Sequence, residues 1–563
     1  MSGPALTAVM AVSAPAWAAL LGLGLARGRD SHLVAAGLGV LGAFVALAAG
    51  IAEAALTWDG ATQVTRIPLL GTAQTGGSGD LTIDLTLRSD ALSGLVSVAV
   101  ALVALCVQIY SAGYLTERYR PYAATVSLFT AAMLLVVHAD DIVLLLIGWE
   151  VMGICSYLLI GHHSERQAAR SAAAKAFLVT RVGDVGFLLG VVVLMASAGT
   201  SSITGLLDSA GTIPVGSLTL ACLLLLAGVV GKSAQFPLHT WLPDAMEGPT
   251  PVSALIHAAT MVAAGVYVVA RLYPLYTQAP AALVVLGAIT AATMLGAALA
   301  AFAQSDLKRL LAWSTISQVA IMLSALATGV GRNGQAAAIA HLLSHAAFKA
   351  LLFLAAGAVI HLVGSNLLRD MGGLRHRAPV VAWTFTIGLV ALAGVPPVSG
   401  FWSKEAVLST AESAVLDAGG AGAAIGWLVL IAGMLTTVVT AAYATRAFCL
   451  VVLGPAQRAA AGQHDRLPRS LTWPLVVLAV PSVGLGLLFW AGPAALRGLH
   501  LTWLTAVIGT LLVLAGIGLG WTAARRPSRD AADAVPVGVR ATLAEGYRAD
   551  EAVAFLVVRP LRR

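Results

Sequence analysis

The chain has little charge, few cysteines and almost no lysine. Only 10% of its 563 residues are charged and 59% are hydrophobic, whereas a soluble globular chain carries about 25% charged residues. This composition argues against a soluble catalytic domain. The four cysteines stand singly in or beside apolar runs, without Cys-x-x-Cys or His/Cys spacing, so no zinc or iron–sulfur site is expected.

Arginine supplies 28 of the 33 basic residues, and lysine only five. All five lysines fall in or beside apolar segments. The five are Lys175, Lys232, Lys308, Lys349 and Lys404. Only lysine readily releases its proton, since a guanidinium stays charged at any working pH. Lysine kept inside apolar segments indicates proton movement. The alternative is a compositional bias that converted every tolerant lysine to arginine.

Apolar runs long enough to cross a bilayer recur from end to end, and the mean hydropathy is +0.88. The sequence therefore predicts an all-α polytopic membrane protein of about 15 transmembrane helices. The predicted spans are 5–26, 33–56, 91–115, 122–138, 141–160, 171–198, 216–241, 251–273, 280–303, 307–328, 335–363, 380–411, 424–452, 472–492 and 501–523.

Basic residues in the links predict the orientation, because cytoplasmic loops are enriched in lysine and arginine. The first span lacks a basic segment before it, so we expect it to stay uncleaved with the N-terminus outside. Links after odd-numbered spans then hold most basic residues: Arg27, Arg29, Arg118, Arg120, Arg166, Arg170, Lys308, Arg309, Arg369, Arg375, Arg377, Arg458, Arg466 and Arg469. Links after even-numbered spans hold Arg66, Arg88, Arg271, Arg332 and Arg497. The C-terminal tail is therefore expected in the cytoplasm, and the net charge of +7 reflects orientation, not nucleic-acid binding.

Polar segments are few. The link 57–90 contains the Gly/Ser-rich stretch Thr72–Asp80 and the alternating stretch Leu81–Leu87, which predicts a short hairpin on the outer face. The tail 525–563 ends in Tyr547–Val558, a possible start of an amphipathic helix. The formal nucleotide-loop match Gly37–Gly42 lies inside an apolar span, so we reject it.

Two spans carry comparable Pro/Gly interruptions next to a lysine. The seventh holds Gly231–Pro237 with Lys232, and the twelfth holds Gly394–Glu405 with Lys404. Broken helices inside a bilayer are tolerated where the freed backbone faces protein or a hydrated cavity. Corresponding breaks in two halves predict a transporter of two inverted repeats, here of five helices each, with discontinuous helices 7 and 12.

Ionisable residues within the spans are costly, at about 2.5–3.5 kcal/mol or more each at the bilayer centre. His341, His345 and Lys349 follow one another at i, i+4 and i+8 and so share a helix face. Burial disfavours a charged amine and a neighbouring carboxylate favours it, while histidine titrates near neutrality. These properties predict a lateral proton route through Glu150, Lys232, His257, His341, His345, Lys349 and Lys404.

Other ionisable residues allow simpler interpretations. Lys175, Arg181 and Asp184 in the sixth span are membrane anchors, a buried ion pair or part of proton uptake. Asp306 and Lys308 favour an interfacial role, and Glu405 closes the series beside Lys404. His257 alone could be a packing histidine, whereas three aligned groups on one helix are a poor way to pack helices.

Several motifs of this sequence resemble one family, the antiporter-like L subunit (chain 5) of NADH–quinone oxidoreductase (respiratory complex I). This family lies within the Mrp-type proton antiporter superfamily. The resemblance covers about residues 80–455 and rests on Gly148–Gly161, Lys175–Asp184, Gly231–Met246, Gly248–Met261, Ser305–Thr315 and Phe401–Glu405. It implies that Glu150 and Lys232 form a carboxylate–lysine pair, with Asp184 a further functional carboxylate. It also implies a central relay through His257, His341, His345 and Lys349, and an exit lysine, Lys404.

The resemblance also implies partners and a division of the chain. Flavin, iron–sulfur clusters and the quinone reaction would belong to partner subunits, with no cofactor on this chain, and the M-type antiporter-like subunit would be a neighbour in the cell inner membrane. The expected parts are the N-terminal helices with the hairpin (1–121), two antiporter-like halves (122–273 and 280–453), and the C-terminal helices with a short tail (454–563).

One departure and three alternatives remain. Members of this type continue past the fifteenth span into a long lateral helix, which this sequence lacks, so a reduced or split relative of complex I is also possible. The same titratable series would serve a multi-subunit Na⁺/H⁺ antiporter, or a hydrogenase- or bicarbonate-linked relative. A non-conducting structural subunit is the alternative from another class.

Overall fold

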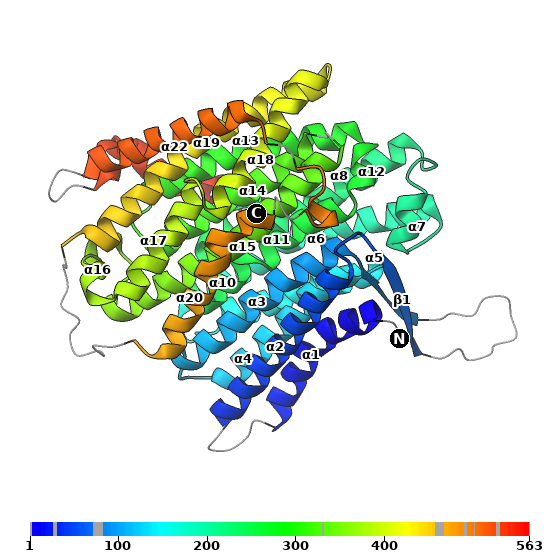
Figure 1. Cartoon of the computed structure of the whole chain (residues 1–563), viewed down its shortest axis with the longest axis horizontal. Coiled ribbons are helices and arrows are strands. Elements are labelled where there is room, and N and C mark those ends of the chain that lie inside the picture. The colour runs from blue at the N-terminus through cyan, green and yellow to red at the C-terminus, as the bar shows by residue number, and fades with distance from the viewer. Residues whose placement is uncertain are drawn as a thin grey trace, which may run out of the picture.

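The computed structural model describes residues 3–25, 31–70, 83–328, 331–455, 467–488, 492–499, 501–524 and 530–561. Among these residues, 14 helical segments are long and apolar enough to cross a bilayer, and they lie side by side in one bundle (Figure 1). In an apolar medium every backbone amide needs an internal partner, which a helix provides. The predicted all-α polytopic fold is confirmed.

Most predicted spans are single helices. They are α1 (Gly3–Leu25), α2 (Ser31–Leu56), α3 (Ala91–Tyr114), α4 (Tyr119–His138), α5 (Ile142–Ile160), α6 (Gln167–Ala198), α8 (Val215–Lys232), α13 (Pro280–Ala303), α14 (Leu307–Ala327), α15 (Gly331–Val363), α19 (Ala421–Phe448), α20 (Arg469–Gly484) and α22 (Trp503–Ala524). Short helices connect them or follow them: α7 (Ile203–Asp208), α9 (Trp241–Asp244), α12 (Tyr273–Thr277), α16 (Leu374–Arg377), α23 (Val537–Ala544), α24 (Ala549–Val553) and α25 (Arg559–Leu561).

Both predicted discontinuities are present. The seventh span ends as α8 at Lys232 and resumes only as the short α9. The twelfth is divided into α17 (Pro379–Ala393) and α18 (Ser399–Asp417), which is why it is not among the 14 long helices. A Cβ on Gly400 would lie 1.8 Å from the Ala391 carbonyl oxygen, so only glycine lets the two half-helices meet this closely.

The eighth span is also broken, which the sequence did not predict. It consists of α10 (Thr250–Ala258) and α11 (Met261–Arg271), separated at Thr260, whose hydroxyl donates to the Leu255 carbonyl at 2.6 Å. The predicted span 251–273 is thus present as Thr250–Arg271, but in two helical pieces. No proline or glycine marks the interruption, so this segment lacks the usual breaker residues.

Helix α15 lies at the centre of the bundle, where it packs against α3, α10, α14, α17, α18 and α20. The N-terminal helices α1, α2 and α4 form one side (Figure 1). Small residues allow close helix packing: a Cβ on Gly183 of α6 would lie 2.6 Å from the Ala227 carbonyl oxygen of α8. Most of α15 is buried by the helices around it.

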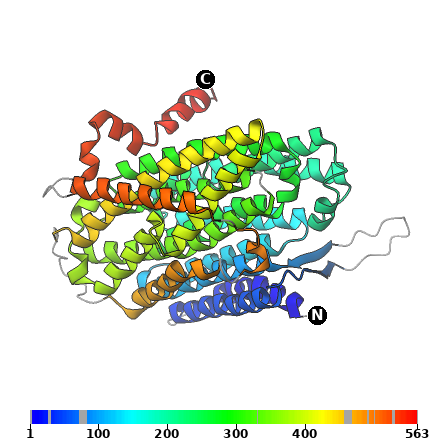
Figure 2. The ribbon, with the colours of Figure 1, turned by 45° about the horizontal axis from the view of Figure 1, so that its top comes forward.

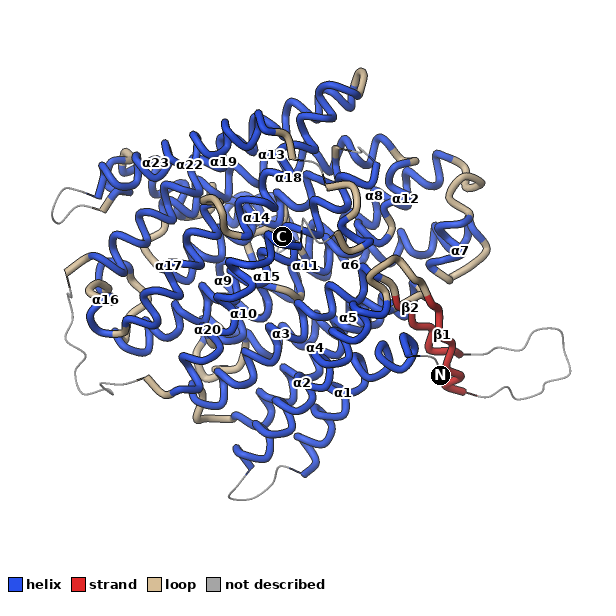
Figure 3. The backbone as a smooth tube through the Cα atoms, viewed as in Figure 1, coloured by secondary structure: helices blue, strands red, loops and turns tan. Residues whose placement is uncertain are grey.

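The predicted hairpin is confirmed as β1 (Gln63–Leu70) and β2 (Ile83–Ser89), which pair antiparallel with Gln63 opposite Ser89. They are the only two strands in the described ranges, and Figure 3 shows them near the N-terminal end of α1. The stretch Thr72–Asp80 lies outside the described residues.

The C-terminal tail returns over the bundle after α22, as Figure 2 shows. The Tyr547 hydroxyl donates to the Gly296 carbonyl of α13 at 2.7 Å, and burial raises the pKa of Tyr547 to about 12. The expected amphipathic start at Tyr547–Val558 forms α24 and one π-helical turn, Ala554–Val558.

Candidate functional site: buried amines and imidazoles across the bundle

Lys232 is the last residue of α8 and is fully buried at the first break. Its ammonium Nζ lies 3.3 Å from Oδ2 of Asp184 on α6, and Trp149 donates from Nε1 to the other oxygen of Asp184 at 2.7 Å. A Cβ on Gly153 would lie only 2.7 Å from the lysine Nζ, so glycine makes room for the ammonium. The break thus contains a buried amine–carboxylate pair.

Backbone carbonyls around this break accept hydrogen bonds from side chains of the protein. Ser233 donates its hydroxyl hydrogen to the Val262 carbonyl at 2.8 Å, and Trp241 donates from Nε1 to the Gly231 carbonyl at 3.0 Å. Paired backbone groups allow α8 to end inside the bundle without a large desolvation penalty. The geometry of Lys232 is therefore fixed by the fold.

Glu150 does not contact Lys232 directly, which differs from the expected pairing. It forms an ion pair with Arg181, and both side chains are partly exposed, at 27% and 36%. Glu150 acts on Lys232 only through the longer-range electrostatic interaction. The carboxylate in contact with Lys232 is Asp184, which the sequence placed in a supporting position.

The central stripe is confirmed as one face of a continuous helix. His341, His345 and Lys349 all lie on α15 and are at most 1% exposed. His341 meets α18 through a 2.9 Å contact between its Nδ1 and the Ser403 hydroxyl, and Lys349 donates to the Leu311 carbonyl of α14 at 3.1 Å. The helices α14, α15 and α18 therefore meet at this stripe.

His257 on α10 joins the stripe from the side. It is fully buried, its ring lies 4.7 Å from that of Phe353, and it interacts electrostatically with His345 and Lys349. Among the contacts of the described residues, none joins His257 directly to Lys232. The step between the first break and the stripe is therefore longer than the steps along α15.

Lys404 and Glu405 lie at the second break but point to different neighbours. The Lys404 ammonium donates to the Leu392 carbonyl of α17. Glu405 is 3% exposed and faces α22, where a Cβ on Gly509 would lie 2.1 Å from its Oε1. Successive helix residues point about 100° apart, so Lys404 faces α17 while Glu405 faces α22.

A polar track beyond Glu405 was not predicted. Ser409 lies one turn further on α18, and its hydroxyl is 3.0 Å from that of Thr505 on α22. Thr505 is 2.7 Å from the Thr502 hydroxyl, which donates to Glu412. The spacing 405, 409, 412 places these residues on one helix face, a signal that was visible in the sequence. The track ends at Glu412, which is partly exposed.

The supporting residues hold the ends of the helices. Lys175 contacts Asp244 at 2.6 Å and Asp550 of the tail at 2.7 Å. Asp306 caps α14 by accepting from the Arg309 amide at 3.0 Å, and burial raises its pKa. Lys308 donates to the carbonyls of Met246 and Gly248, at 2.8 Å for the latter. These contacts fit structural roles at the helix ends.

Family comparisons agree with this arrangement. The model described as NADH:quinone oxidoreductase/Mrp antiporter, TM, matches residues 139–438, and that of the N-terminus of chain 5 of NADH-ubiquinone oxidoreductase (complex I) matches residues 77–123. The chain belongs to this family. Subunit L of NADH-quinone oxidoreductase from Mycobacterium tuberculosis is 39% identical over 436 residues, which is 77% of this chain and 67% of that protein.

Two further relatives extend the comparison. NAD(P)H-quinone oxidoreductase chain 5 of Picosynechococcus is 39% identical over 454 residues, 74% of this chain and 66% of that protein. This chain therefore spans about two thirds of the length of these relatives. The Mrp complex of Dietzia includes a chain similar over 98% of this one and 60% of its own length, with 27% identity and a TM-score of 0.78.

A structure of an archaeal membrane-bound sulfane sulfur reductase shares the fold, with a TM-score of 0.72 at 23% identity over 91% of this chain and 99% of that one. The family match covers every residue of the predicted route from Glu150 to Lys404. Within the described residues, no group of three His, Cys, Asp or Glu side chains is arranged to hold a metal ion.

Many buried polar atoms along the route have no hydrogen-bond partner among the described residues. They include Asp184 Oδ2, Lys232 Nζ, both ring nitrogens of His257 and of His345, both amide atoms of Gln318, His341 Nε2 and Glu405 Oε2. Such atoms are rare in folded proteins because each costs about 1–3 kcal/mol. Their concentration here marks a polar interior that internal water can satisfy.

Proposed function

We propose that this chain is a proton-translocating membrane subunit of an NADH–quinone oxidoreductase, in which partner subunits carry out the redox chemistry. The observation that carries the proposal is the burial of Lys232, Lys349 and Lys404 inside the bundle, at 0%, 0% and 4% exposure. An amine that served as a membrane anchor would extend to the lipid headgroups. Buried amines next to imidazoles are suited to holding and passing protons.

The proposed route runs laterally from Lys232 with Asp184, through His257 and the α15 stripe, to Lys404. Moving a proton onto or off Asp184 changes the charge next to Lys232 and therefore the stability of its ammonium form. The unpartnered Gln318 on α14 and His257 mark the polar interior between the first break and the stripe. Water in that interior would bridge the step without direct contacts.

We place the exit on the α18–α22 side. Glu405 accepts the proton that Lys404 releases. Ser409 and Thr505 then lead it to Glu412, the partly exposed end of the track. With the predicted orientation, this end faces outward and the C-terminal tail lies in the cytoplasm. The cell inner membrane, the M-type neighbour, and flavin, iron–sulfur clusters and quinone on partner subunits belong to the same proposal.

Lysine-to-arginine substitution tests the route, because arginine keeps the positive charge but does not release a proton. We expect Lys232→Arg and Lys404→Arg to abolish most proton pumping in membrane vesicles, measured with a pH-sensitive dye, while the complex assembles on a native gel. Lys175→Arg is the matched control, since an arginine there can keep both aspartate contacts. Unchanged pumping in assembled Lys232→Arg and Lys404→Arg complexes would support a purely structural subunit.

A Na⁺/H⁺ antiporter subunit is the second candidate, favoured by the similarity to the Mrp complex over 98% of this chain. Both functions use the same buried series, so the partners decide between them. Co-purification with flavin- and iron–sulfur-containing subunits supports the oxidoreductase. Co-purification with small membrane subunits alone, with Na⁺-dependent proton flux, supports the antiporter, and a hydrogenase or carbonic-anhydrase-like partner indicates the other relatives.

A further inference from the structure

A second buried acid–base pair lies in the N-terminal helices, away from the proposed route. Glu53 on α2 and His138 at the end of α4 are both 0% exposed, and Glu53 Oε2 lies 2.8 Å from His138 Nε2. Neither residue falls within the segments that match the family models. A charge buried among apolar helices is costly, so a burial of this kind points to a role for the pair.

Hydrogen-bond stereochemistry requires the pair to hold a proton. His138 Nδ1 lies 2.8 Å from the Leu134 carbonyl oxygen, which only accepts, so Nδ1 must carry a hydrogen. In a neutral imidazole Nε2 is then an acceptor facing the carboxylate Oε2 at 2.8 Å. Two acceptors at this distance repel each other unless a proton lies between them. The contact is therefore either imidazolium–carboxylate or imidazole–carboxylic acid, with one shared proton.

A hydroxyl connects this proton to the end of the bundle that bears the hairpin. Ser93 Oγ lies 2.7 Å from Glu53 Oε1 and 2.9 Å from the Asp90 carbonyl oxygen, so its single hydrogen can serve either acceptor. The Asp90 carboxylate in turn contacts Arg271 and Arg88. Ser93 and Ser97 contact the pair, and Arg271 interacts electrostatically with His138. The charged and titratable groups around Arg271 are Asp90, Arg88, Tyr267 and, through Arg88, Asp140.

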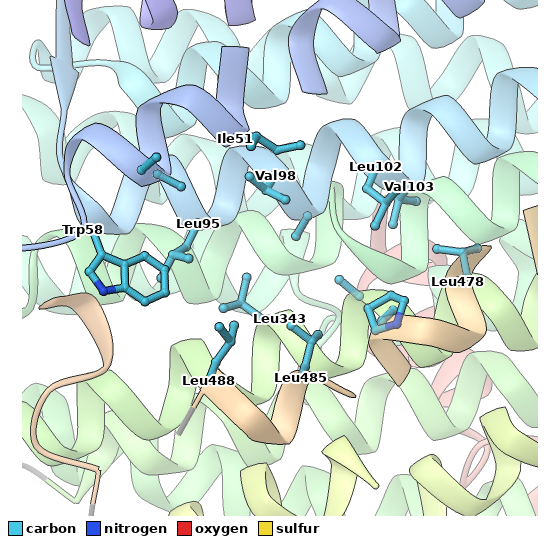
Figure 4. Close-up of a pocket in the computed structure, with 16 residues that line it drawn as sticks. Ile51, Trp58, Leu95, Val98, Leu102, Val103, Leu343, Leu478, Leu485 and Leu488 are labelled. Atoms are coloured by element: carbon cyan, nitrogen blue, oxygen red, sulfur yellow. The ribbon is translucent and has the colours of Figure 1, made fainter. Parts of the chain in front are cut away.

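The opposite side of α2 offers no such path. An apolar cavity of about 370 Å³ lies between α2, α3, α15 and α20, lined by residues such as Ile51, Leu95, Leu343 and Leu485 (Figure 4). Its lining contains no titratable side chain. The pair is therefore insulated from the α15 stripe on this side and open through Ser93 on the other.

We propose that Glu53 and His138 form a second protonation site, separate from the lysine–histidine route, that exchanges its proton through Ser93 with the hairpin end of the bundle. On release, Glu53 takes the shared proton on Oε2 as a carboxylic acid, and a half-turn of the carboxyl group brings that O–H to Ser93 Oγ. The Ser93 oxygen accepts this proton while its own hydrogen, directed to the Asp90 end, leaves to water. Glu53 is then a carboxylate facing the acceptor Nε2 of neutral His138, so the pair favours taking a proton back. The nearby Arg271, itself paired with Asp90, offsets the charge only in part. The site needs no transport event and can be measured in the resting protein.

Infrared difference spectroscopy on the purified full-length protein tests the site. Between pH 5 and 9 we expect a carboxyl or imidazole band that shifts in D₂O and is lost in Glu53→Gln, whose amide can still donate to His138 Nε2. Lys404→Arg is the control and should retain the band, so the result is independent of the transport route. A wild-type spectrum without such a band, or one identical in Glu53→Gln, would overturn the proposal and leave a purely structural pair.

Ser93→Ala provides a second measurement that keeps the pair intact, and it is decisive if Glu53→Gln does not fold. We expect the band to remain but its hydrogen–deuterium exchange to slow by about tenfold or more, since a tenfold change corresponds to about 1.4 kcal/mol of barrier. Exchange at the wild-type rate would overturn the role of Ser93.

Discussion

The two broken helices hold their lysines in different electrostatic surroundings. At the first break Lys232 lies 3.3 Å from the Asp184 carboxylate. At the second break Lys404 donates to a backbone carbonyl, and the adjacent Glu405 points toward α22. An opposite charge within about 4–6 Å favours the charged amine. The Asp184 carboxylate therefore favours the ammonium form of Lys232, whereas Lys404 has no carboxylate in comparable contact in the part of the chain that the structure describes.

The difference follows from where the carboxylate comes from. Asp184 belongs to another helix, α6, so packing alone brings it to Lys232. Glu405 follows Lys404 in the same helix, where neighbours one residue apart do not face each other. This difference supports the proposed direction of the route, from uptake at Lys232 to release at Lys404.

The strongest test of this comparison removes the carboxylate at the first break. Asp184→Asn leaves Lys232 buried without a counter-charge, and breaking a buried pair costs about 3–5 kcal/mol if the charge remains. Lys232 can avoid that cost by losing its proton, and it then holds none for transport. We therefore expect proton pumping in vesicles to fall by more than about tenfold. Glu150→Gln, which removes only the partly exposed pair with Arg181, should lose less. A larger loss in Glu150→Gln would reverse the assignment of the two carboxylates.

Sequence patterns predicted the parts of this comparison that depend on local spacing. The stripe on α15 followed from the i, i+4, i+8 spacing of His341, His345 and Lys349, and the breaks beside Lys232 and Lys404 followed from proline and glycine. The division into two repeats stays a prediction. Contacts between helices distant in sequence could not be predicted, since no local pattern shows which carboxylate packs against Lys232.

Two missed features differ in kind. The break at Thr260 has no breaker residue and arises from tertiary packing. Glu53 was visible as a lone acid inside an apolar span, a signal that deserved a functional hypothesis. Its partner His138 lies 85 residues away and at a helix end, so the pair itself appears only in three dimensions.

Two glycines offer a gentler perturbation of each lysine's surroundings. Gly153→Ala would place a Cβ 2.7 Å from Lys232 Nζ, and Gly509→Ala would place one 2.1 Å from Glu405 Oε1. Each must displace the end of a flexible side chain, and overpacking of this kind costs about 1–3 kcal/mol. We expect both to lower pumping several-fold in assembled complexes, with Gly509→Ala slowing release and Gly153→Ala lengthening the Lys232–Asp184 contact. Gly518→Ala, whose Cβ meets nothing within 4 Å, is the control. Wild-type pumping in both glycine variants would show that these contacts do not limit transport.

The smallest expected effect concerns two ion-pair anchors, one at the end of α11 and one near the end of α19. Arg271 of α11 is paired with Asp90, and Arg446 of α19 with Asp530 of the tail. For each aspartate burial raises the pKa, but the paired arginine outweighs burial and the net pKa lies below the ordinary value of 3.8. A lowered pKa contributes stability above that ordinary value, and this contribution disappears as pH falls through the folded-state pKa.

Acidification should therefore release the tail anchor before the other one. Asp530 is 22% exposed, whereas Asp90 is 11% exposed and also contacts Arg88, so its pKa lies further below the ordinary value. Hydrogen exchange measured stepwise from pH 5 to pH 3 should show residues 530–544 losing protection while residues 89–95 remain protected. In Asp530→Asn the tail should exchange at a rate that no longer depends on this anchor's titration. Earlier loss of protection at 89–95 would mean that the two anchors rank in the opposite order, with the more buried aspartate forming the weaker one.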